Sequence, residues 1–355
     1  MPLKILHIID KTHYAGVTSY VLNLIKSLEQ VEHVILSCYK GSAAAEIEGM
    51  NIKCEHLIVH SRTSYKLLLK KYLRSIIFFR KNKFDIVHYQ QGGIGILLIA
   101  VFFNRNIKVI HHLQSSNLIG DHSKSEISFI HKQLLKFLSY KTIKIAVADH
   151  VEEIYKKVLP TNDMLFTIKT SVPYNFNHKE KYSNTIGFIG RINKKKGIDN
   201  FLHLADSFYN IDRNIHFIVQ GGIEDQIKLN SNILYNKPTF NIANFFNEID
   251  LLYFLSTSQE GLPLVVLEAI SFDVGVIAFR LPGVVEILGE DYPLYINHPD
   301  EATLKIKDFY SHKIDRNYLS KIHQERSSKF LFDDMIGKID SLYKSLFNEK
   351  SITNF

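Results

Sequence analysis

The chain has 355 residues, 46% hydrophobic and 12% aromatic, which is enough for two globular domains and too apolar for disorder to dominate. Its two cysteines, with no CxxC pair and no histidine cluster at ligand spacing, argue against a disulfide framework or a zinc site and fit a reducing compartment. The net charge is +7, and the basic excess lies in residues 1–170, which carry 23 Lys and Arg against 13 Asp and Glu.

The first residues, MPLKILHIID, contain one short apolar run and no small-residue cleavage site. We therefore expect a first β-strand there and not a secretory signal. The longest uncharged apolar run, residues 94–103, is about half as long as a membrane span requires. The sequence predicts a protein that is made and kept in the cytoplasm.

Short apolar strand patterns alternate with helical patterns along the whole chain. They begin at residues 4, 33, 53, 84, 108 and 143 in the first half, and at residues 185, 215, 233, 251 and 275 in the second. Several are almost entirely apolar, as expected for parallel strands covered on both faces. The pattern predicts an α/β fold with two Rossmann-like, doubly wound domains, residues 1–170 and 171–355, that face each other across one cleft.

The turn after the first strand contains one glycine, Gly16, which opens the following helix. It is either an ordinary turn residue or a point where a ligand approaches the backbone. The sequence has no GxGxxG after this strand, no GxxxxGK[ST] and no DxD. Dinucleotide dehydrogenases, P-loop enzymes and metal-dependent GT-A transferases are therefore disfavoured, and we expect neither a metal nor a cofactor.

Residues 62–84 form the most basic segment, with eight basic residues and no acidic one. Lys66, Lys70 and Arg74 recur on one helical face, Lys71 lies beside them, and leucine and isoleucine residues stand between. Such a helix can lie on an anionic membrane surface, with these four residues facing the lipid. It can equally be the solvated outer face of an α/β layer. Nucleic-acid binding is disfavoured because no recognised nucleic-acid module is present.

Residues 250–286 read as an apolar strand, a polar turn and a helix that begins at Leu262 or Pro263, because proline suits the first helical turn. Glu260 then lies in the turn and Glu268 one to two turns inside the helix. In one continuous helix they would be about 12 Å apart at ~1.5 Å per residue, too far to share one sugar carbon. A loop that folds back lets them reach different hydroxyls of one ligand, while free N–H groups near Gly261 face an anion. Hydroxyls at two places with a phosphate between them describe a nucleotide sugar.

Two glutamates, Glu260 and Glu268, stand with seven residues between them. The segment IGFIGRINKKKG precedes them at residues 186–197, and LPGVVE follows at residues 281–286. This combination resembles the EX7E pattern of retaining glycosyltransferases of glycosyltransferase family 4. The resemblance implies the GT-B fold and a last helix, about residues 329–347, that crosses back onto the first domain. It implies that Glu260 contacts the donor sugar, Glu268 the ribose, and that Arg191 and Lys196 hold the diphosphate. Further donor-binding residues implied by the resemblance are Gly16, Gly190, Gly261, Leu262 and Pro263.

The N-terminal half resembles this family only loosely. Where the family often has histidines at two neighbouring strand ends, this chain has Gln90 and Gln114, which can hydrogen-bond a hydroxyl but cannot take a proton. His112 points to the same face as Gln114 and is either a substitute on the acceptor or sugar side or a buried structural histidine. In the second half, Asp273 and Gly275 stand where the family usually has a glycine and a proline.

The prediction is a retaining, metal-independent hexosyltransferase that moves a sugar from a nucleotide sugar, a UDP-sugar before a GDP-sugar, to a lipid-linked or saccharide acceptor. With the basic first half, this indicates a cytoplasmic, peripheral protein at the inner face of the plasma membrane that builds a bacterial O-antigen, capsule or exopolysaccharide. Two alternatives stay open: a catalytically silent GT-B subunit that binds a partner glycosyltransferase, and a soluble GT-B transferase with a small sugar acceptor.

Overall fold

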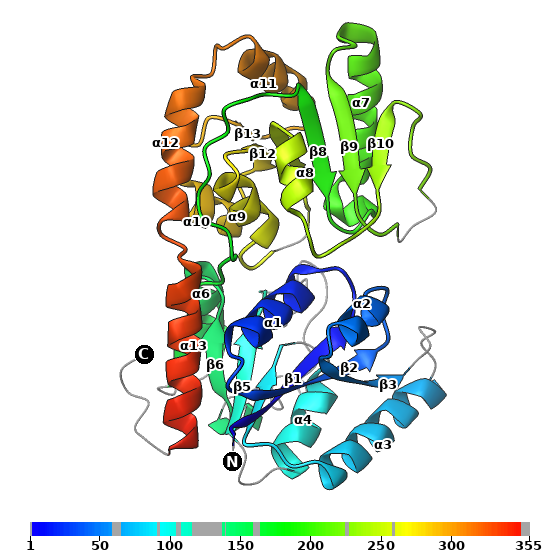
Figure 1. Cartoon of the computed structure of the whole chain (residues 1–355), viewed down its shortest axis with the longest axis vertical. Coiled ribbons are helices and arrows are strands. Elements are labelled where there is room, and N and C mark those ends of the chain that lie inside the picture. The colour runs from blue at the N-terminus through cyan, green and yellow to red at the C-terminus, as the bar shows by residue number, and fades with distance from the viewer. Residues whose placement is uncertain are drawn as a thin grey trace. The chain divides into compact units, whose positions relative to one another are not determined.

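The computed structural model describes residues 2–58, 65–90, 93–103, 108–115, 137–138, 140–158, 164–223, 227–257 and 260–348 (Figure 1). The chain divides into two compact units. The first comprises Met1–His13, Val17–Lys169 and Asp333–Phe355, and the second comprises Tyr14–Gly16 and Thr170–Phe332. The chain therefore returns to the first unit after completing the second.

The first unit is built on a seven-stranded sheet with the order β3-β2-β1-β4-β5-β6-β7, in which all paired strands are parallel. The order reverses between β1 and β4, and both of these central strands are buried because helices cover the two faces of the sheet (Figure 1). The strands are β1 Lys4–Lys11, β2 Glu32–Tyr39, β3 Lys53–Ile58, β4 Ile86–Tyr89, β5 Lys108–Leu113, β6 Ile143–Ala146 and β7 Leu165–Thr167. The helices are α1 Gly16–Ser27, α2 Ala44–Gly49, α3 Tyr65–Lys81, α4 Ile94–Phe103, α6 Asp149–Val158 and α13 Phe332–Phe347.

The second unit is built on a six-stranded parallel sheet with the order β10-β9-β8-β11-β12-β13. Here the order reverses between β8 and β11. The strands are β8 Thr185–Ile189, β9 His216–Gln220, β10 Ile233–Asn236, β11 Leu251–Phe254, β12 Gly275–Phe279 and β13 Tyr295–Ile296. The helices are the 3₁₀ turn η2 Lys194–Lys196, α7 Ile198–Ile211, α8 Ala243–Glu248, α9 Leu264–Ser271, α10 Pro282–Leu288, α11 Glu301–Tyr310 and α12 Arg316–Ser327.

Helices pack closely on the second sheet. Phe201 and Phe208 of α7 contact the ring of Phe217 on β9, with centroids 5.6 and 5.9 Å apart. Next to α8, a Cβ on Gly187 of β8 would lie 2.6 Å from the ring of Phe245, so only glycine allows this helix to approach. Because side chains occupy the faces of the sheet, the carboxyl ends of the strands are what is left for a ligand.

The prediction of two doubly wound α/β domains is confirmed, and all eleven predicted strands form. The prediction missed β7 and β13, which have three and two residues. Strands this short carry no readable alternation of apolar and polar residues, since two or three positions fit any period.

Helix α3 presents only part of the predicted basic face to solvent. Lys66 and Lys70 are exposed. Lys71, however, is 5% exposed and lies over the rings of Tyr39 and Tyr72, at 5.4 and 5.2 Å, so the prediction that it faces a membrane is wrong. The reason is helical phase: position 71 lies on the side that α3 buries, together with positions 75 and 78. Arg74 is exposed but donates a hydrogen bond to the Leu57 carbonyl at 2.7 Å.

Asp273 follows α9 and has a φ of 55°, a left-handed conformation that favours glycine. Its carboxylate is 2% exposed and is ringed by partners. Ser320 Oγ donates to it at 2.7 Å, and the Nδ1 atoms of His178 and His323 each lie 2.8 Å away. Burial opposes the charged form, but the hydrogen bonds from His323 and Ser320 and the His323 charge hold the pKa of Asp273 below its usual value. This network explains why an aspartate is stable where the family pattern has glycine, and it ties the end of α9 to α12.

Replacing Asp273 with glycine should lower the free energy of unfolding by about 2–4 kcal/mol, even though glycine suits the backbone, because buried polar groups lose their acceptor. Ser320→Ala, which removes a single donor, should cost only about 1 kcal/mol. Urea denaturation measures both. Since the folded pKa of Asp273 lies below the unfolded one, its stabilisation is present above the unfolded pKa and is lost as pH falls through the folded pKa. The gap between wild type and Asp273→Gly should therefore close in acid, and equal stabilities at neutral pH would contradict this account.

Candidate active site

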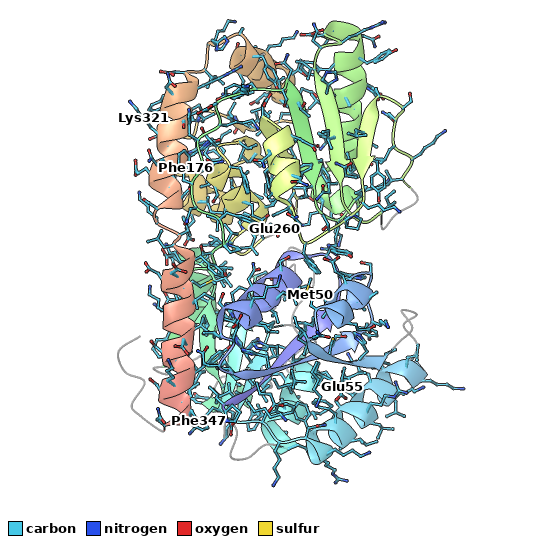
Figure 2. The ribbon with its side chains drawn as sticks, viewed as in Figure 1. Met50, Glu55, Phe176, Glu260, Lys321 and Phe347 are labelled. Carbon is cyan, nitrogen blue, oxygen red and sulfur yellow. The ribbon has the colours of Figure 1, made fainter. Side chains whose placement is uncertain are left out.

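Two loops meet at the carboxyl ends of β8 and β11, which are neighbours in the second sheet. The loop after β8 runs through residues 190–197, and the described residues between β11 and α9 are 255–257 and 260–263. Figure 2 shows Glu260 at the edge of the second unit where these strands end. Each loop carries predicted site residues, so the topology brings together parts of the chain that are far apart in sequence.

The lysine turn after β8, residues 194–196, is held in place by a side-chain cap and by the residues that follow β11. Asn193 caps the 3₁₀ turn, since its Oδ1 accepts from the Lys196 backbone N–H at 3.1 Å. Gly197 ends the turn with a φ of 84°, and a Cβ there would lie 2.6 Å from the Leu255 carbonyl oxygen. The Thr257 backbone N–H donates to the Lys195 carbonyl at 3.0 Å. The two loops are thus fastened together at the backbone.

Lys196 and Glu260 form an ion pair at this junction, although they are 64 residues apart in the sequence. Ser256 Oγ donates a second hydrogen bond to the same Glu260 oxygen at 2.9 Å. The side chains of Lys196 and Glu260 are 21% and 23% exposed, so a ligand can reach them. The structure therefore joins two of the predicted site residues at one point.

The segment that follows Glu260 is buried up to the start of α9. Gly261, Leu262 and Pro263 are buried, and Pro263 is the N-cap, with φ −73° and ψ 102°. The helix therefore begins at Leu264, one to two residues later than predicted, because the extended ψ of Pro263 keeps it outside the first turn. The Pro263 carbonyl accepts the first helical hydrogen bond, from the Val266 N–H at 3.0 Å.

Gly283, near the start of α10, packs closely against the backbone of this segment. A Cβ on Gly283 would lie 1.9 Å from the Gly261 carbonyl oxygen. Gly283→Ala should therefore displace the segment, lower the free energy of unfolding by about 1–3 kcal/mol and weaken donor binding. Gly337→Ala is the control, since no atom lies within 4 Å of a Cβ at that helical position and alanine should stabilise α13 by about 0.4–1 kcal/mol. Denaturation and ligand titration of both variants test this; unchanged stability of Gly283→Ala would contradict the close contact.

Glu268 is the fifth residue of α9 and lies one turn inside the helix, as predicted from the proline. Burial raises the pKa of its carboxyl to about 8. Among the described residues, no hydrogen bond or ion pair engages this carboxyl group. Tyr174 lies near it, since burial and then the Glu268 charge raise the pKa of the Tyr174 hydroxyl. Glu268 is half-buried, and a poorly solvated acid without a partner is expected where a ligand supplies the missing contacts.

Glycines follow the carboxyl ends of the neighbouring strands β8 and β9. Gly190 and Gly221 have φ values of 135° and 154°, and a Cβ on Gly221 would lie 1.7 Å from the Gly190 carbonyl oxygen. By contrast, a Cβ on Gly190 or Gly222 would meet no atom within 4 Å, so the space next to these two glycines is open. The exposed Arg191 follows directly. These glycines let a ligand approach the backbone close in sequence to the basic side chains of Arg191 and Lys196.

Three site residues were predicted in the first half of the chain: Gly16, His112 and Gln114. Gly16 is the first residue of α1 and belongs to the second unit. His112 is 1% exposed, stacks on His88 with Nδ1 3.0 Å from His88 Nε2, and burial lowers its pKa to about 3. The structure favours the structural role for His112. Gln114 is half-buried and donates to Gln90 Oε1 at 2.5 Å, which leaves the buried Gln90 Nε2 without a partner among the described residues.

Several residues that shape the site were not predicted from the sequence. Asn193 holds the lysine turn, Ser256 and Thr257 hold the loop after β11, and Tyr174 approaches Glu268. Asn193 could have been predicted, because asparagine is a typical N-cap residue and stands directly before the first residue of the turn. The described part of the chain contains no group of three or more His, Cys, Asp or Glu side chains that could hold a metal ion.

Comparison with known proteins gives consistent results. Residues 174–326 match the family described as glycosyl transferases group 1. The chain is 25% identical over 97% of its length to all of an uncharacterized 41.2 kDa protein in the cps region of Klebsiella pneumoniae. It is 22% identical over 98% of its length to 99% of the O-antigen biosynthesis glycosyltransferase WclY of Escherichia coli. The crystal structure of Anabaena Alr3699/HepE in complex with UDP and glucose superposes with a TM-score of 0.75 at 13% identity, covering 97% of this chain and 100% of that one. The last likeness agrees with the predicted GT-B fold.

Proposed function

We propose, from the match of residues 174–326 to glycosyl transferases group 1, that this chain is a retaining glycosyltransferase of family 4 that uses a nucleotide sugar. The observation that carries the proposal is the Lys196–Glu260 pair at the carboxyl ends of β8 and β11, followed one turn inside α9 by the unpartnered Glu268. In this proposal the basic side chains bind the diphosphate of one nucleotide sugar, and the two carboxyl groups bind its hydroxyls.

The basic side chains stabilise the leaving group in this proposal. Negative charge grows on the diphosphate as the glycosidic bond breaks, and fixed cations beside it lower the barrier. Lys196 has three N–H donors, so it can bind a phosphate oxygen while it still contacts Glu260. Arg191 offers a planar guanidinium that can grip two phosphate oxygens, and the glycines beside it admit the phosphates to close range.

The two carboxyl groups orient the donor. Glu260, held by Ser256, accepts hydrogen bonds from sugar hydroxyls and fixes the reacting carbon. Glu268 binds the ribose, whose hydroxyls supply the partners that this half-buried group lacks. No further carboxylate acts as a nucleophile in this proposal; the departing phosphate takes the proton of the acceptor on the same face of the sugar, which retains the configuration.

For the substrates we propose a UDP-sugar as donor and a lipid-linked or saccharide acceptor in bacterial surface polysaccharide synthesis. UDP and glucose are bound by the structurally similar Anabaena protein, and the Escherichia coli relative acts in O-antigen biosynthesis. The donor is the first substrate to identify.

Calorimetric titration of the purified chain with nucleoside diphosphates and nucleotide sugars tests the proposal. We expect binding of one nucleotide series, with uracil preferred, and loss of that binding in Arg191→Ala. Binding should persist with EDTA present, because Arg191 and Lys196 supply the positive charge. Proton NMR of the product should show the anomeric configuration of the donor. An inverted product would refute the retaining mechanism, and no binding of any nucleotide would favour a silent subunit.

A further inference from the structure

Helix α3 exposes a row of apolar side chains along its outer face. Leu69, Leu73 and Ile77 recur every four residues and are 62%, 52% and 51% exposed. The side that α3 buries is a different one, with Ser75 at 0% and Phe78 and Phe79 at 6% and 4%. The core of the first unit is thus complete without the outer row. A contiguous apolar row on a protein surface indicates a binding partner.

Basic side chains flank this row, and α3 contains no acidic residue. Lys66 and Lys70 are exposed near Leu69, and Arg80 and Lys81 are exposed at the other end near Ile77. The helix therefore combines an apolar centre with a positive margin. Helices of this composition lie in the plane of a membrane surface, with their apolar side chains at the boundary between headgroups and acyl chains.

Helix α4 extends the same surface. It packs beside α3 on one side of the sheet (Figure 1), and its last residues Phe102 and Phe103 are 62% and 40% exposed. The Arg80 guanidinium lies 5.7 Å from the centre of the Phe103 ring, so the apolar surfaces of the two helices adjoin. Phe102 stacks on Phe137, itself 38% exposed, with centroids 5.8 Å apart.

We propose that the outer surface of α3 and α4, made of Leu69, Leu73, Ile77, Phe102 and Phe103 with the basic residues around them, docks on an anionic lipid bilayer. The apolar side chains enter the headgroup boundary while Lys66, Lys70, Arg80 and Lys81 pair with lipid phosphates. The charge selects the partner: a second copy would bring the same basic residues against each other, whereas an anionic bilayer complements them. None of the helices that the structure describes has the length and hydropathy of a membrane span.

The proposal does not depend on the proposed enzymatic function, because vesicle binding can be measured without substrates. Flotation of the chain with phosphatidylcholine vesicles, with and without phosphatidylglycerol, gives a partition coefficient. Lys66→Ala/Lys70→Ala should lower binding to the anionic vesicles roughly 10- to 30-fold, and salt should weaken the wild type similarly. Leu69→Ser/Leu73→Ser/Ile77→Ser should lower it on the order of 10- to 100-fold.

Matched controls lie on other elements. Leu304→Ser removes a 60% exposed leucine from α11, and Lys321→Ala/Lys338→Ala removes two exposed lysines from α12 and α13; both should bind vesicles like the wild type. The substituted α3 residues are at the surface, and urea denaturation of every variant verifies the fold independently of any ligand. Failure of vesicle binding by the folded wild type would overturn only the docking proposal. Equal binding to neutral and anionic vesicles would overturn it, as would a dimer that the triple variant abolishes without any vesicle binding.

Discussion

Lys196→Ala should lower kcat for sugar transfer on the order of 100- to 1,000-fold, because it removes a fixed cation from the diphosphate that gains charge in the transition state. The unfolding free energy should change by less than about 1 kcal/mol, since the Lys196–Glu260 pair is partly exposed and such pairs contribute little to stability. Steady-state kinetics with the donor identified by calorimetry, together with urea denaturation, separates the two effects.

Lys195→Ala is the matched control for this prediction. Lys195 belongs to the same 3₁₀ turn and is exposed, and the contact it makes with Thr257 uses its backbone carbonyl, which alanine keeps. It should retain wild-type transfer within about threefold. Equal losses in Lys195→Ala and Lys196→Ala would mean that the turn contributes only general positive charge. Unchanged transfer in Lys196→Ala would remove Lys196 from the site.

Glu268→Gln should weaken donor binding about 10- to 100-fold and at the same time stabilise the protein without ligand by up to about 3 kcal/mol at neutral pH. The affinity falls because the ribose hydroxyls favour the ionised carboxylate, which accepts through both oxygens, whereas an amide offers only one acceptor. The stability rises because glutamine removes a carboxyl that is costly to ionise in its buried position. Calorimetry and urea denaturation measure the two opposite effects.

The stability gained in Glu268→Gln should depend on pH, because the pKa of Glu268 differs between the folded and the unfolded chain. The pKa of Glu268 is about 8 in the folded protein, against an ordinary value near 4.5. Between these two values the folded chain keeps a proton that the unfolded chain has lost, so the stability of the wild type falls as pH rises through this window. Glu268→Gln should remove that slope, with no gain in stability near pH 4.5 and the full gain near pH 8. Glu248→Gln, at an exposed position, is the control. Parallel stability curves for Glu268→Gln and the wild type would refute the burial of this acid.

The strands and the division into two α/β domains could be predicted from the sequence because the apolar runs are long and the breaks between them clear. The loop position of Glu260 and the helical position of Glu268 followed from one proline between them. The start of α9 was predicted one to two residues early, since the propensity of proline for the first turn does not distinguish the N-cap from the residues after it.

Contacts between side chains that are distant in sequence could not be predicted in this way. The prediction placed Lys71 with the membrane-facing residues because it stands next to Lys70, but the burial of Phe78 and Phe79 fixes the rotation of α3 and turns Lys71 inward over two tyrosine rings. The same rotation leaves Leu69, Leu73 and Ile77 outside. A period of 3.6 residues shows which residues share a face, whereas packing decides which face is buried.

The sequence by itself determined the class of fold, the order of its elements and the types of residue offered at the strand ends, because these depend on local periodicity and on single turn residues. Only the tertiary structure decided that Lys196 meets Glu260, that His112 is a core residue and that Asp273 can occupy a left-handed turn. Each of these depends on the order of strands in a sheet or on partners supplied by another helix. The free energy of such contacts comes from neighbours in space, which the linear pattern does not contain.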